Sequence, residues 1–310
     1  MSRPVVAGVD GSSASLAAAE EAARAARQRD RPLHLVHGFL HPLGYGVPLN
    51  PYDLGLPAPT DGAQKMLEQT ARDLTGRWPG LRVEVRQVAG GPGATLIEES
   101  RRAELVVVGS RGLGGFAGLL LGSVSGQVAS HAHCPVLVVR PTEEPVPTEG
   151  PVLVGVDGSE SAELAVGYAA DEAARRGTDL VLLHVAPTDG TATPGREGLV
   201  TDGAGTRDRA EAPDRVEAPE RAGHEPSALL ATAVAAARGS HPGLTVAGRT
   251  VRADSAGQAL VEASGQAVLV VVGTRGRGGF TGLLLGSVSQ ALVQHAHCPV
   301  LVAHPYGQGH

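Results

Sequence analysis

Blocks of apolar residues separated by polar segments predict an alternation of buried strands and amphipathic helices. The chain opens with an apolar run over Val5–Val9 that ends at Asp10. An unbroken apolar run of this length is typical of a strand buried on both faces of a parallel sheet. Small apolar residues then recur at helical spacing, which predicts a helix with a narrow stripe that packs closely on the sheet. The stripe consists of Leu16, Ala19, Ala23 and Ala26.

The same alternation fills the rest of the first half. Further strands are predicted at 33–37, 81–85, 105–108 and 135–139, and further helices at 64–76, 94–102 and 123–132. Strands and helices in alternation indicate βαβ units, and hence an α/β fold with a parallel sheet and helices on both faces. A Pro- and Gly-rich stretch over 38–62 is long for a connection in a compact domain, so we expect a functional or disordered loop there.

The pattern then restarts, which indicates an internal duplication. Val152–Val156, followed by Asp157, repeats the first strand 147 positions after Asp10. From Gly273 onward the offset is 164, so the second half holds 17 additional residues before that point. The charged stretch 186–225 has little apolar content and is the expected insertion, which we expect to be mobile. The predicted organisation is a first domain over 1–141, a linker over 142–150 and a second domain over 151–305.

Each half also contains a strand followed by glycines at fixed spacing. The first copy reads LVVVGSRG over 105–112 and GSVS over 122–125, and the second reads LVVVGTRG over 269–276 and GSVS over 286–289. Glycines let backbone N–H groups come close to a ligand, and GSVS opens the next helix. A helix N-terminus offers unpaired N–H donors and the positive end of the helix dipole. The pattern therefore predicts a nucleotide phosphate cradle in each half.

Composition excludes several classes of function. The 310 residues suffice for two domains, and the formal charge of −6 gives no basic field for nucleic acid. Aromatic residues make up 3% of the chain, which argues against stacking on single strands. The sequence shows no secretory leader and no apolar run near the ~20 residues of a membrane span, so we expect a cytoplasmic protein without membrane contact. Two cysteines do not form a disulfide framework.

Three motifs together carry a resemblance to a known family. Val-Asp-Gly-Ser after the first strand, the Gly-x2-Gly-x9-Gly-Ser element and the closing His-Cys-Pro-Val strand occur in both halves. In these features the chain resembles the universal stress protein family, as a tandem two-domain member of its ATP-binding branch. The resemblance implies a five-stranded, doubly wound parallel sheet in each half and ATP, with or without Mg, as ligand. It also implies a homodimer formed through the last strands, here 135–139 and 299–303.

The predicted ligand site lies at the carboxyl ends of the strands, where the strand order of a doubly wound sheet reverses. In the first half the predicted nucleotide-binding residues are Asp10, Gly109, Arg111, Gly112, Gly122, Ser123, Val124 and Ser125. In the second half they are Asp157, Val185, Gly273, Arg275, Gly276, Gly286, Ser287, Val288 and Ser289. The resemblance further implies that the second-strand ends, near Gly38 and Val185, line the base through their backbones.

Several of these residues have an alternative interpretation. The two aspartates accept hydrogen bonds from the adenosine, or they only shape their Asp-Gly turns. Ser123 and Ser287 cap their helices, and Ser287-x-x-Gln290 fits a capping box, which is compatible with phosphate binding. Ser125 and Ser289 are expected to offer hydroxyl donors to the phosphates. Arg111 and Arg275 either reach the phosphates or lie in solvent.

Other motifs do not carry chemistry. Gly112-x-Gly114-x-x-Ala117 fits a loose dinucleotide fingerprint, but no acid follows at ~20 residues to hold a ribose. The glycine element lacks the lysine and spacing of a P-loop. His131-x-His133-Cys134 and its second copy do not complete a four-ligand zinc site, so we expect histidines at a helix C-terminus and ordinary core cysteines.

Three hypotheses on function follow. The first is an ATP-binding regulatory or stress-response protein with one nucleotide per domain, acting through conformation or partner choice. The second is a slow ATP hydrolase, and the third is an interaction module with vestigial nucleotide sites. The absence of His, Lys or acid within the glycine loops argues against the hydrolase, because phosphoryl transfer needs charge stabilisation.

Overall fold

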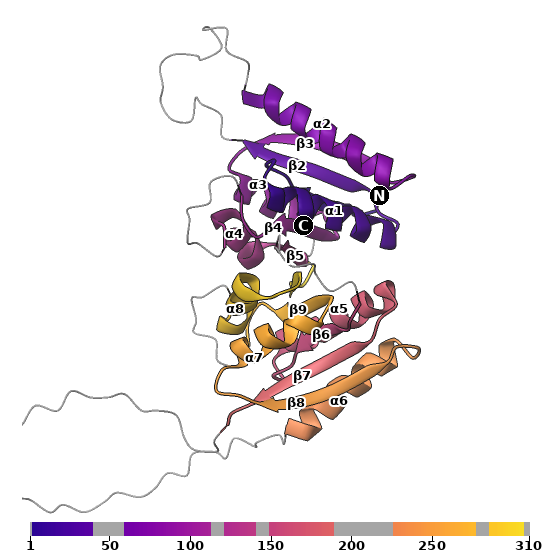
Figure 1. The fold of residues 1–310 in the computed structure, drawn as a ribbon, viewed down its shortest axis with the longest axis vertical. Coiled ribbons are helices and arrows are strands. Elements are labelled where there is room, and N and C mark those ends of the chain that lie inside the picture. Colours follow the sequence, from indigo (N-terminus) through magenta and orange to yellow (C-terminus); the bar gives the residue numbers. More distant parts are fainter. Residues whose placement is uncertain are drawn as a thin grey trace, which may run out of the picture.

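The computed structural model describes residues 2–39, 59–112, 121–140, 149–188, 226–276 and 285–306. The first half contains β1 (Val5–Gly8), α1 (Ser13–Gln28), β2 (Leu33–Phe39), α2 (Pro59–Arg77), β3 (Val83–Ala89), α3 (Pro92–Ser100), β4 (Leu105–Gly109), α4 (Ser123–His131) and β5 (Val136–Val139) (Figure 1). The second half contains β6 (Val152–Gly155), α5 (Glu160–Arg176), β7 (Leu180–Ala186), α6 (Pro226–Ser240), β8 (Val246–Arg252), α7 (Ala256–Ala263), the 3₁₀ turn η3 (Ser264–Gln266), β9 (Leu269–Gly273), α8 (Ser287–His295) and β10 (Val300–Ala303).

The strands form one continuous ten-stranded sheet in the order β3-β2-β1-β4-β5-β10-β9-β6-β7-β8. All pairs within each half are parallel, as expected for βαβ units. In each half the order reverses at the first strand, where the second strand lies on one side and the fourth on the other. The carboxyl ends of β1 and β4, and of β6 and β9, therefore flank the switch point at which α/β sheets bind ligands.

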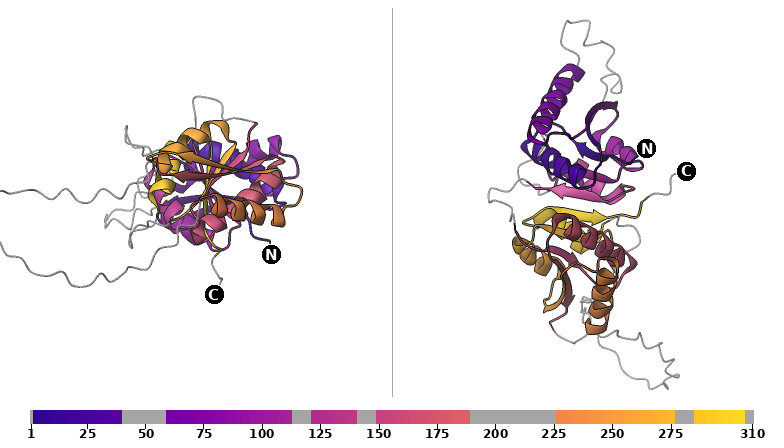
Figure 2. Two further views of the ribbon diagram at one scale, coloured as in Figure 1. Left: turned by 90° about the horizontal axis from the view of Figure 1, so that it is seen from below. Right: turned by 90° about the vertical axis from the view of Figure 1, so that its right-hand side faces the viewer.

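The two halves join through their last strands. β5 and β10 pair antiparallel, with Leu137 opposite Leu301, and lie side by side at the middle of the molecule (Figure 2). This corrects two expectations. The strands form one ten-stranded sheet and not two five-stranded sheets. The last strands pair with each other within one chain and do not pair two copies of the chain. Each already has a neighbour on both edges, because β4 and β9 occupy the other sides.

Helices cover both faces of this sheet, and each face has a core that runs through both halves. One core contains the apolar sides of α1, α2, α5 and α6, and the other contains those of α3, α4, α7 and α8. The alanines of α1 explain how it packs so closely, because Ala18, Ala22 and Ala26 are fully buried on β-strand residues such as Val107. A stripe of small side chains brings the helix axis close to the strands.

Buried charges also connect the halves. Arg29 at the end of α1 pairs with Glu172 on α5, and Arg176 Nη2 on α5 lies 2.9 Å from Glu21 Oε1 on α1. All four side chains are at most 9% exposed. Burial lowers the pKa of Arg29, while the Glu172 carboxylate acts in the opposite direction. The buried charges are thus neutralised across the junction, as charges removed from water must be.

The predicted loop over 38–62 is shorter at both ends. Its first two residues belong to β2, which ends at Phe39, and its last residues belong to a helix, because α2 begins at Pro59. Residues 40–58 and most of the predicted 186–225 insertion, from 189 to 225, lie outside the described residues. Among the described helices, none is long and apolar enough to cross a lipid bilayer.

Candidate functional site

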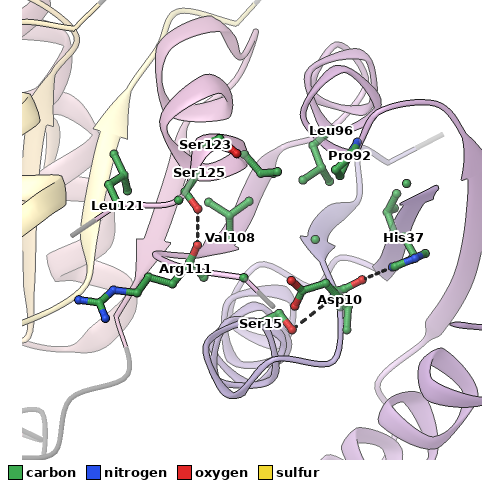
Figure 3. A pocket seen from close by; sticks show the side chains of 18 residues that line it. Asp10, Ser15, His37, Pro92, Leu96, Val108, Arg111, Leu121, Ser123 and Ser125 are labelled. Atoms are coloured by element: carbon green, nitrogen blue, oxygen red, sulfur yellow. Dashed lines mark hydrogen bonds between the residues drawn. The ribbon is translucent and has the colours of Figure 1, made fainter. Parts of the chain in front are cut away.

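Each half has a pocket at the carboxyl ends of its strands, with a volume of 530 Å³ in the first half and 470 Å³ in the second. Figure 3 shows how the first pocket is assembled from β1, β2, β4 and the starts of α1, α3 and α4. Every predicted site residue lines the pocket of its own half. These residues are Asp10, Gly109, Arg111, Gly112, Gly122, Ser123, Val124, Ser125, Asp157, Val185, Gly273, Arg275, Gly276, Gly286, Ser287, Val288 and Ser289.

The aspartates use one carboxylate oxygen to shape their turns. Asp10 Oδ1 accepts hydrogen bonds from the backbone N–H and the hydroxyl of Ser12, at 3.0 and 2.6 Å, and Asp157 makes the same pair with Ser159. The second oxygen of Asp10, Oδ2, lies so close to Gly112 that a Cβ there would collide with it. The turn interpretation is therefore correct for one oxygen, while the other faces the glycine segment at the pocket wall (Figure 3).

The helices that follow the glycine-rich segments, α4 and α8, have no side-chain cap among the described residues. Gly122 and Gly286 occupy the N-cap positions of α4 and α8, so the expected capping by Ser123 or Ser287 is wrong. Three other helices are capped by serine hydroxyls, from Ser12, Ser159 and Ser255. A glycine cap leaves the first amides of the helix without a partner.

These amides are the main chemical feature of the site. No acceptor among the described residues takes the N–H groups of 123–125 or 287–289, and the same residues line the pockets. Gly122 N–H donates to the Ser110 carbonyl at 2.8 Å, which fixes the direction in which the helix starts. Three converging donors at the positive end of a helix dipole form an anion site.

The hydroxyls of Ser125 and Ser289 have a different role from the one expected. Each is buried and donates to the last residue of the preceding strand, Ser125 to the Gly109 carbonyl at 2.5 Å and Ser289 to the Gly273 carbonyl at 2.6 Å. A hydroxyl has one hydrogen to donate, and here a carbonyl accepts it. These side chains therefore fasten the helix to the strand end and do not donate to a ligand.

The glycines also divide into two kinds. A Cβ on Gly109 would lie 2.6 Å from the backbone carbon of Ala14, and Gly273 has the same contact with Ser161. These two glycines let α1 and α5 approach the strand ends. A Cβ on Gly122 or Gly286 would meet nothing closer than 3.4 Å, so protein packing does not require glycine there. The absence of a side chain at Gly122 and Gly286 instead leaves space in the pocket.

The arginines match the solvent interpretation. Arg111 and Arg275 are exposed, and in Figure 3 the guanidinium of Arg111 points away from Asp10. Both residues line the pockets. In this arrangement the direction of the Arg111 side chain does not make it a phosphate ligand.

The end of the second strand forms another wall of each pocket, and sequence reasoning found it only in part. Gly38 and Val185 line the pockets as expected. The helix residues opposite them, Pro92 and Ala256, were not anticipated, nor was Leu96 with its counterpart in α7. The offset of 164 between the halves could have identified these residues, because it aligns Leu96 with Leu260 and Pro92 with Ala256.

The cysteines are core residues, as expected. Cys134 and Cys298 are buried, and burial raises the pKa of each thiol to about 12. A thiol with such a pKa is not a thiolate at neutral pH, so it is a poor metal ligand or nucleophile. His131 and His295 end α4 and α8, where the helix dipole is negative.

Comparison with known proteins identifies the class of protein to which this chain belongs. The model of the universal stress protein family matches residues 1–140 and 150–304. The universal stress protein Rv2623 of Mycobacterium tuberculosis (strain H37Rv) is 38% identical over 310 residues, which cover 96% of this chain and 95% of that protein. The chain therefore belongs to the universal stress protein family, with two such domains in tandem.

Solved structures agree on the fold. A universal stress protein from Archaeoglobus fulgidus has a TM-score of 0.69 at 21% identity and covers 99% of this chain and 100% of its own. A universal stress protein in complex with cAMP is 29% identical and covers 46% of this chain and 98% of its own, with a TM-score of 0.35. The first of these confirms the α/β fold over the whole chain.

Proposed function

We propose that this protein is a cytoplasmic, ATP-binding stress-response protein that holds one nucleotide in each half. The observation that carries the proposal is the set of three amides at the start of α4, repeated at the start of α8, that have no acceptor in the described part of the chain. In the proposed complex the phosphates lie on these amides, the ribose near Asp10 or Asp157, and the base at the second-strand end. Backbone donors in fixed positions bind an anion without reorganising.

The residues fit a triphosphate better than a metal centre of their own. Among the described residues no three His, Cys, Asp or Glu side chains are placed to hold a metal ion. Mg²⁺ is commonly bound by substrate phosphates, water and one or two carboxylates, so it would reach these sites with ATP. Asp10 in the first half and Asp157 in the second are the carboxylates at the pocket wall.

A regulatory role is favoured over turnover. In the described parts of the glycine-rich segments, 109–112 and 121–125, arginine is the only charged residue type, and Arg111 points away from the site. Phosphoryl transfer needs cations or a positioned base at the transferred group. The bound nucleotide would therefore act by changing conformation or the choice of partner. Homodimerisation stays a prediction, with no surface assigned to it.

Equilibrium titration with ATP tests the proposal. We expect two sites in the natural chain, one in Gly122→Val or Gly286→Val and none in the double variant, because these side chains fill the space before the helix amides. Gly76→Ala is the matched control, since a Cβ there meets nothing within 4 Å. Absence of binding at millimolar ATP, or two sites in the double variant, contradicts the proposal. Phosphate release in the same samples separates binding from slow hydrolysis.

A further inference from the structure

In each half a histidine side chain extends the hydrogen bonding between the first two strands to the point where they separate. The last paired residues of β1 and β2 are Gly8 and Val36, and the Val9 N–H still donates to the Val36 carbonyl at 2.9 Å. The next donor of a parallel ladder is normally a backbone N–H, here that of Gly38. Among the described residues, the Val9 carbonyl instead accepts from His37 Nδ1, at 2.7 Å (Figure 3). The imidazole thus replaces a backbone donor at the edge of the pocket that it lines.

The second half has the same arrangement. The Val156 N–H donates to the Leu183 carbonyl at 2.9 Å, and His184 Nδ1 lies 2.8 Å from the Val156 carbonyl oxygen. A carbonyl oxygen only accepts, so Nδ1 carries a hydrogen in both rings. His37 and His184 are equivalent at the offset of 147, which means that the duplication keeps this side-chain contact together with the pocket glycines and aspartates.

The histidine fixes the peptide group that precedes the pocket aspartate. In the first half the carbonyl of the Val9–Asp10 peptide accepts from His37, and the N–H of the same peptide donates to Ser15 Oγ at 3.2 Å. Figure 3 shows His37 and Ser15 on opposite sides of Asp10. Asp10 Oδ1 accepts hydrogen bonds within its own turn. With the peptide held on both sides and one carboxylate oxygen held in the turn, the direction of the second oxygen is set before a ligand binds.

The second half holds the equivalent peptide with fewer of these contacts. Ser15 is replaced by Ala162, which has no hydroxyl. The hydroxyl of Ser161, one residue earlier, donates to the Arg275 carbonyl. Of the histidine and the serine that hold the peptide in the first half, only the histidine has a counterpart in the second. The aspartate of the second half should therefore depend more on its histidine than the aspartate of the first half does.

We infer that His37 and His184 are positioning residues for nucleotide binding, and that they act through Asp10 and Asp157. This inference rests on the proposed function. The imidazoles need no contact with the ligand, because each one orders the turn that carries the carboxylate. A polar group that is already in place binds more tightly, because no ordering remains to be done when the ligand arrives. Loss of one such hydrogen bond should weaken binding by about 2- to 12-fold.

Titration of single-site variants with ATP measures the effect. Gly286→Val leaves the first site as the only intact one, and Gly122→Val leaves the second. His37→Phe keeps an aromatic ring without a donor and should weaken the first site about threefold, whereas His184→Phe should weaken the second about tenfold. His37→Asn and His184→Asn should keep the affinity within about twofold of that of the natural chain, because the side-chain amide donates from the location of Nδ1.

Two further variants distinguish positioning from general support of the fold. In an Asp10→Ala background there is no carboxylate to position, so His37→Phe should change the ATP affinity by less than about twofold. Ser15→Ala should weaken the first site about threefold by itself and should raise the effect of an added His37→Phe to about tenfold. In chains with both sites intact, the site of the other half is the control for folding. If His37→Phe abolishes both sites, the chain has unfolded, and Ser15→Ala decides.

The outcomes separate the two proposals. The inference is overturned, with ATP binding intact, if both Phe variants bind ATP as tightly as the natural chain. It is also overturned if the Asn variants are as weak as the Phe variants, or if the loss is equally large in the Asp10→Ala background. Failure of the natural chain to bind ATP overturns the proposed function, and the inference fails with it.

Discussion

The pockets and the junction between the halves differ in how faithfully the duplication is kept. In the pockets the glycines and aspartates recur at fixed offsets, so that Gly109 corresponds to Gly273 and Asp10 to Asp157. At the junction the strand pairing also repeats, because the contacts Val136–Val302 and Val138–Val300 are equivalent, but some side chains around it differ in chemistry. Glu172 corresponds to Ala25 and His304 to Arg140. Backbone geometry constrains the pockets in both copies, whereas the contacts of these side chains form once and need no matching copy.

The charged contacts show this asymmetry clearly. Both halves supply an arginine at the same position, Arg29 and Arg176, yet the carboxylates come from different positions, Glu172 and Glu21. Glu172 also lies 3.4 Å from Arg176, so one acid serves both arginines. The two ion pairs across the junction are therefore not copies of each other.

Removal of the Glu172 charge should have the largest effect. Glu172→Gln leaves Arg29 and Arg176 buried without this partner, and a broken buried pair costs about 3–5 kcal/mol of unfolding free energy. Urea unfolding followed by circular dichroism measures the loss. Glu98→Gln is the control, because the Glu98–Arg101 pair is exposed and is worth at most about 1 kcal/mol. A loss below 1 kcal/mol for Glu172→Gln would show that the junction does not depend on this charge.

The next largest effect should be the difference in stability loss between the two kinds of pocket glycine. Gly109→Ala places a methyl group 2.6 Å from the Ala14 backbone and should cost about 1–3 kcal/mol of stability through overpacking. Gly122→Ala meets only ordinary contacts and should change stability by about 0.5 kcal/mol or less. The same unfolding titration compares them. Equal losses in both variants would refute the division of the glycines.

Acid should weaken the junction through His304. Its ring is buried, Nε2 lies 2.9 Å from the Ala129 carbonyl, and burial lowers the pKa of His304, an effect to which His133 and His131 add. The folded protein therefore binds fewer protons than the unfolded chain below pH ~6.5, and stability falls as the pH is lowered through this range. The slope for one such group is at most about 1.4 kcal/mol per pH unit.

His304→Gln provides the comparison, because glutamine keeps a donor for the Ala129 carbonyl but does not titrate. Thermal unfolding between pH 5 and 7.5 should show a shallower acid loss in this variant than in the natural chain. Part of the loss should persist, because burial also lowers the pKa of His34, next to Glu84. Parallel pH profiles for the two proteins would exclude His304 as a contributor.

A smaller effect than that of Glu172→Gln is expected at the carboxyl end of the described chain. The Tyr306 hydroxyl donates to the Glu104 carbonyl at 3.2 Å, and the residue is 40% exposed. Tyr306→Phe keeps the edge-on ring contact with Tyr168 and removes this hydrogen bond, which should cost about 0.5–1.5 kcal/mol. Differential scanning calorimetry resolves a change of this size. A loss above that of Glu172→Gln would reverse the proposed ranking.

The fold within each half was predictable because its signals are local. Apolar runs such as Leu105–Val108 have the pattern of strands buried on both faces, and the alternation with helices defines parallel βαβ units. The joining of the halves into one sheet was not predictable in the same way. An apolar last strand such as Val136–Val139 needs a neighbour on its free edge, but nothing in its sequence tells whether the neighbour belongs to a second copy or to the same chain.

The site was predictable in its residues and less so in its details. Fixed glycine spacing placed the helix amides in the pocket, but a serine after a glycine does not reveal which of them is the cap. Gly286 proved to be the N-cap where Ser287 and Gln290 suggested a capping box. The direction of the Ser125 hydroxyl and the contact of Gly38 with Pro92 depend on tertiary packing, which a single sequence does not encode locally.

The location of β5 and β10 in one chain has a consequence for how the protein responds to dilution. When the partners of a strand pair belong to separate molecules, their association depends on concentration. Here residues 140–150 tether the two halves, so each meets the other at an effective concentration of the millimolar order typical of short linkers. A cell that holds few copies of this chain would still hold every one of them in the assembled form.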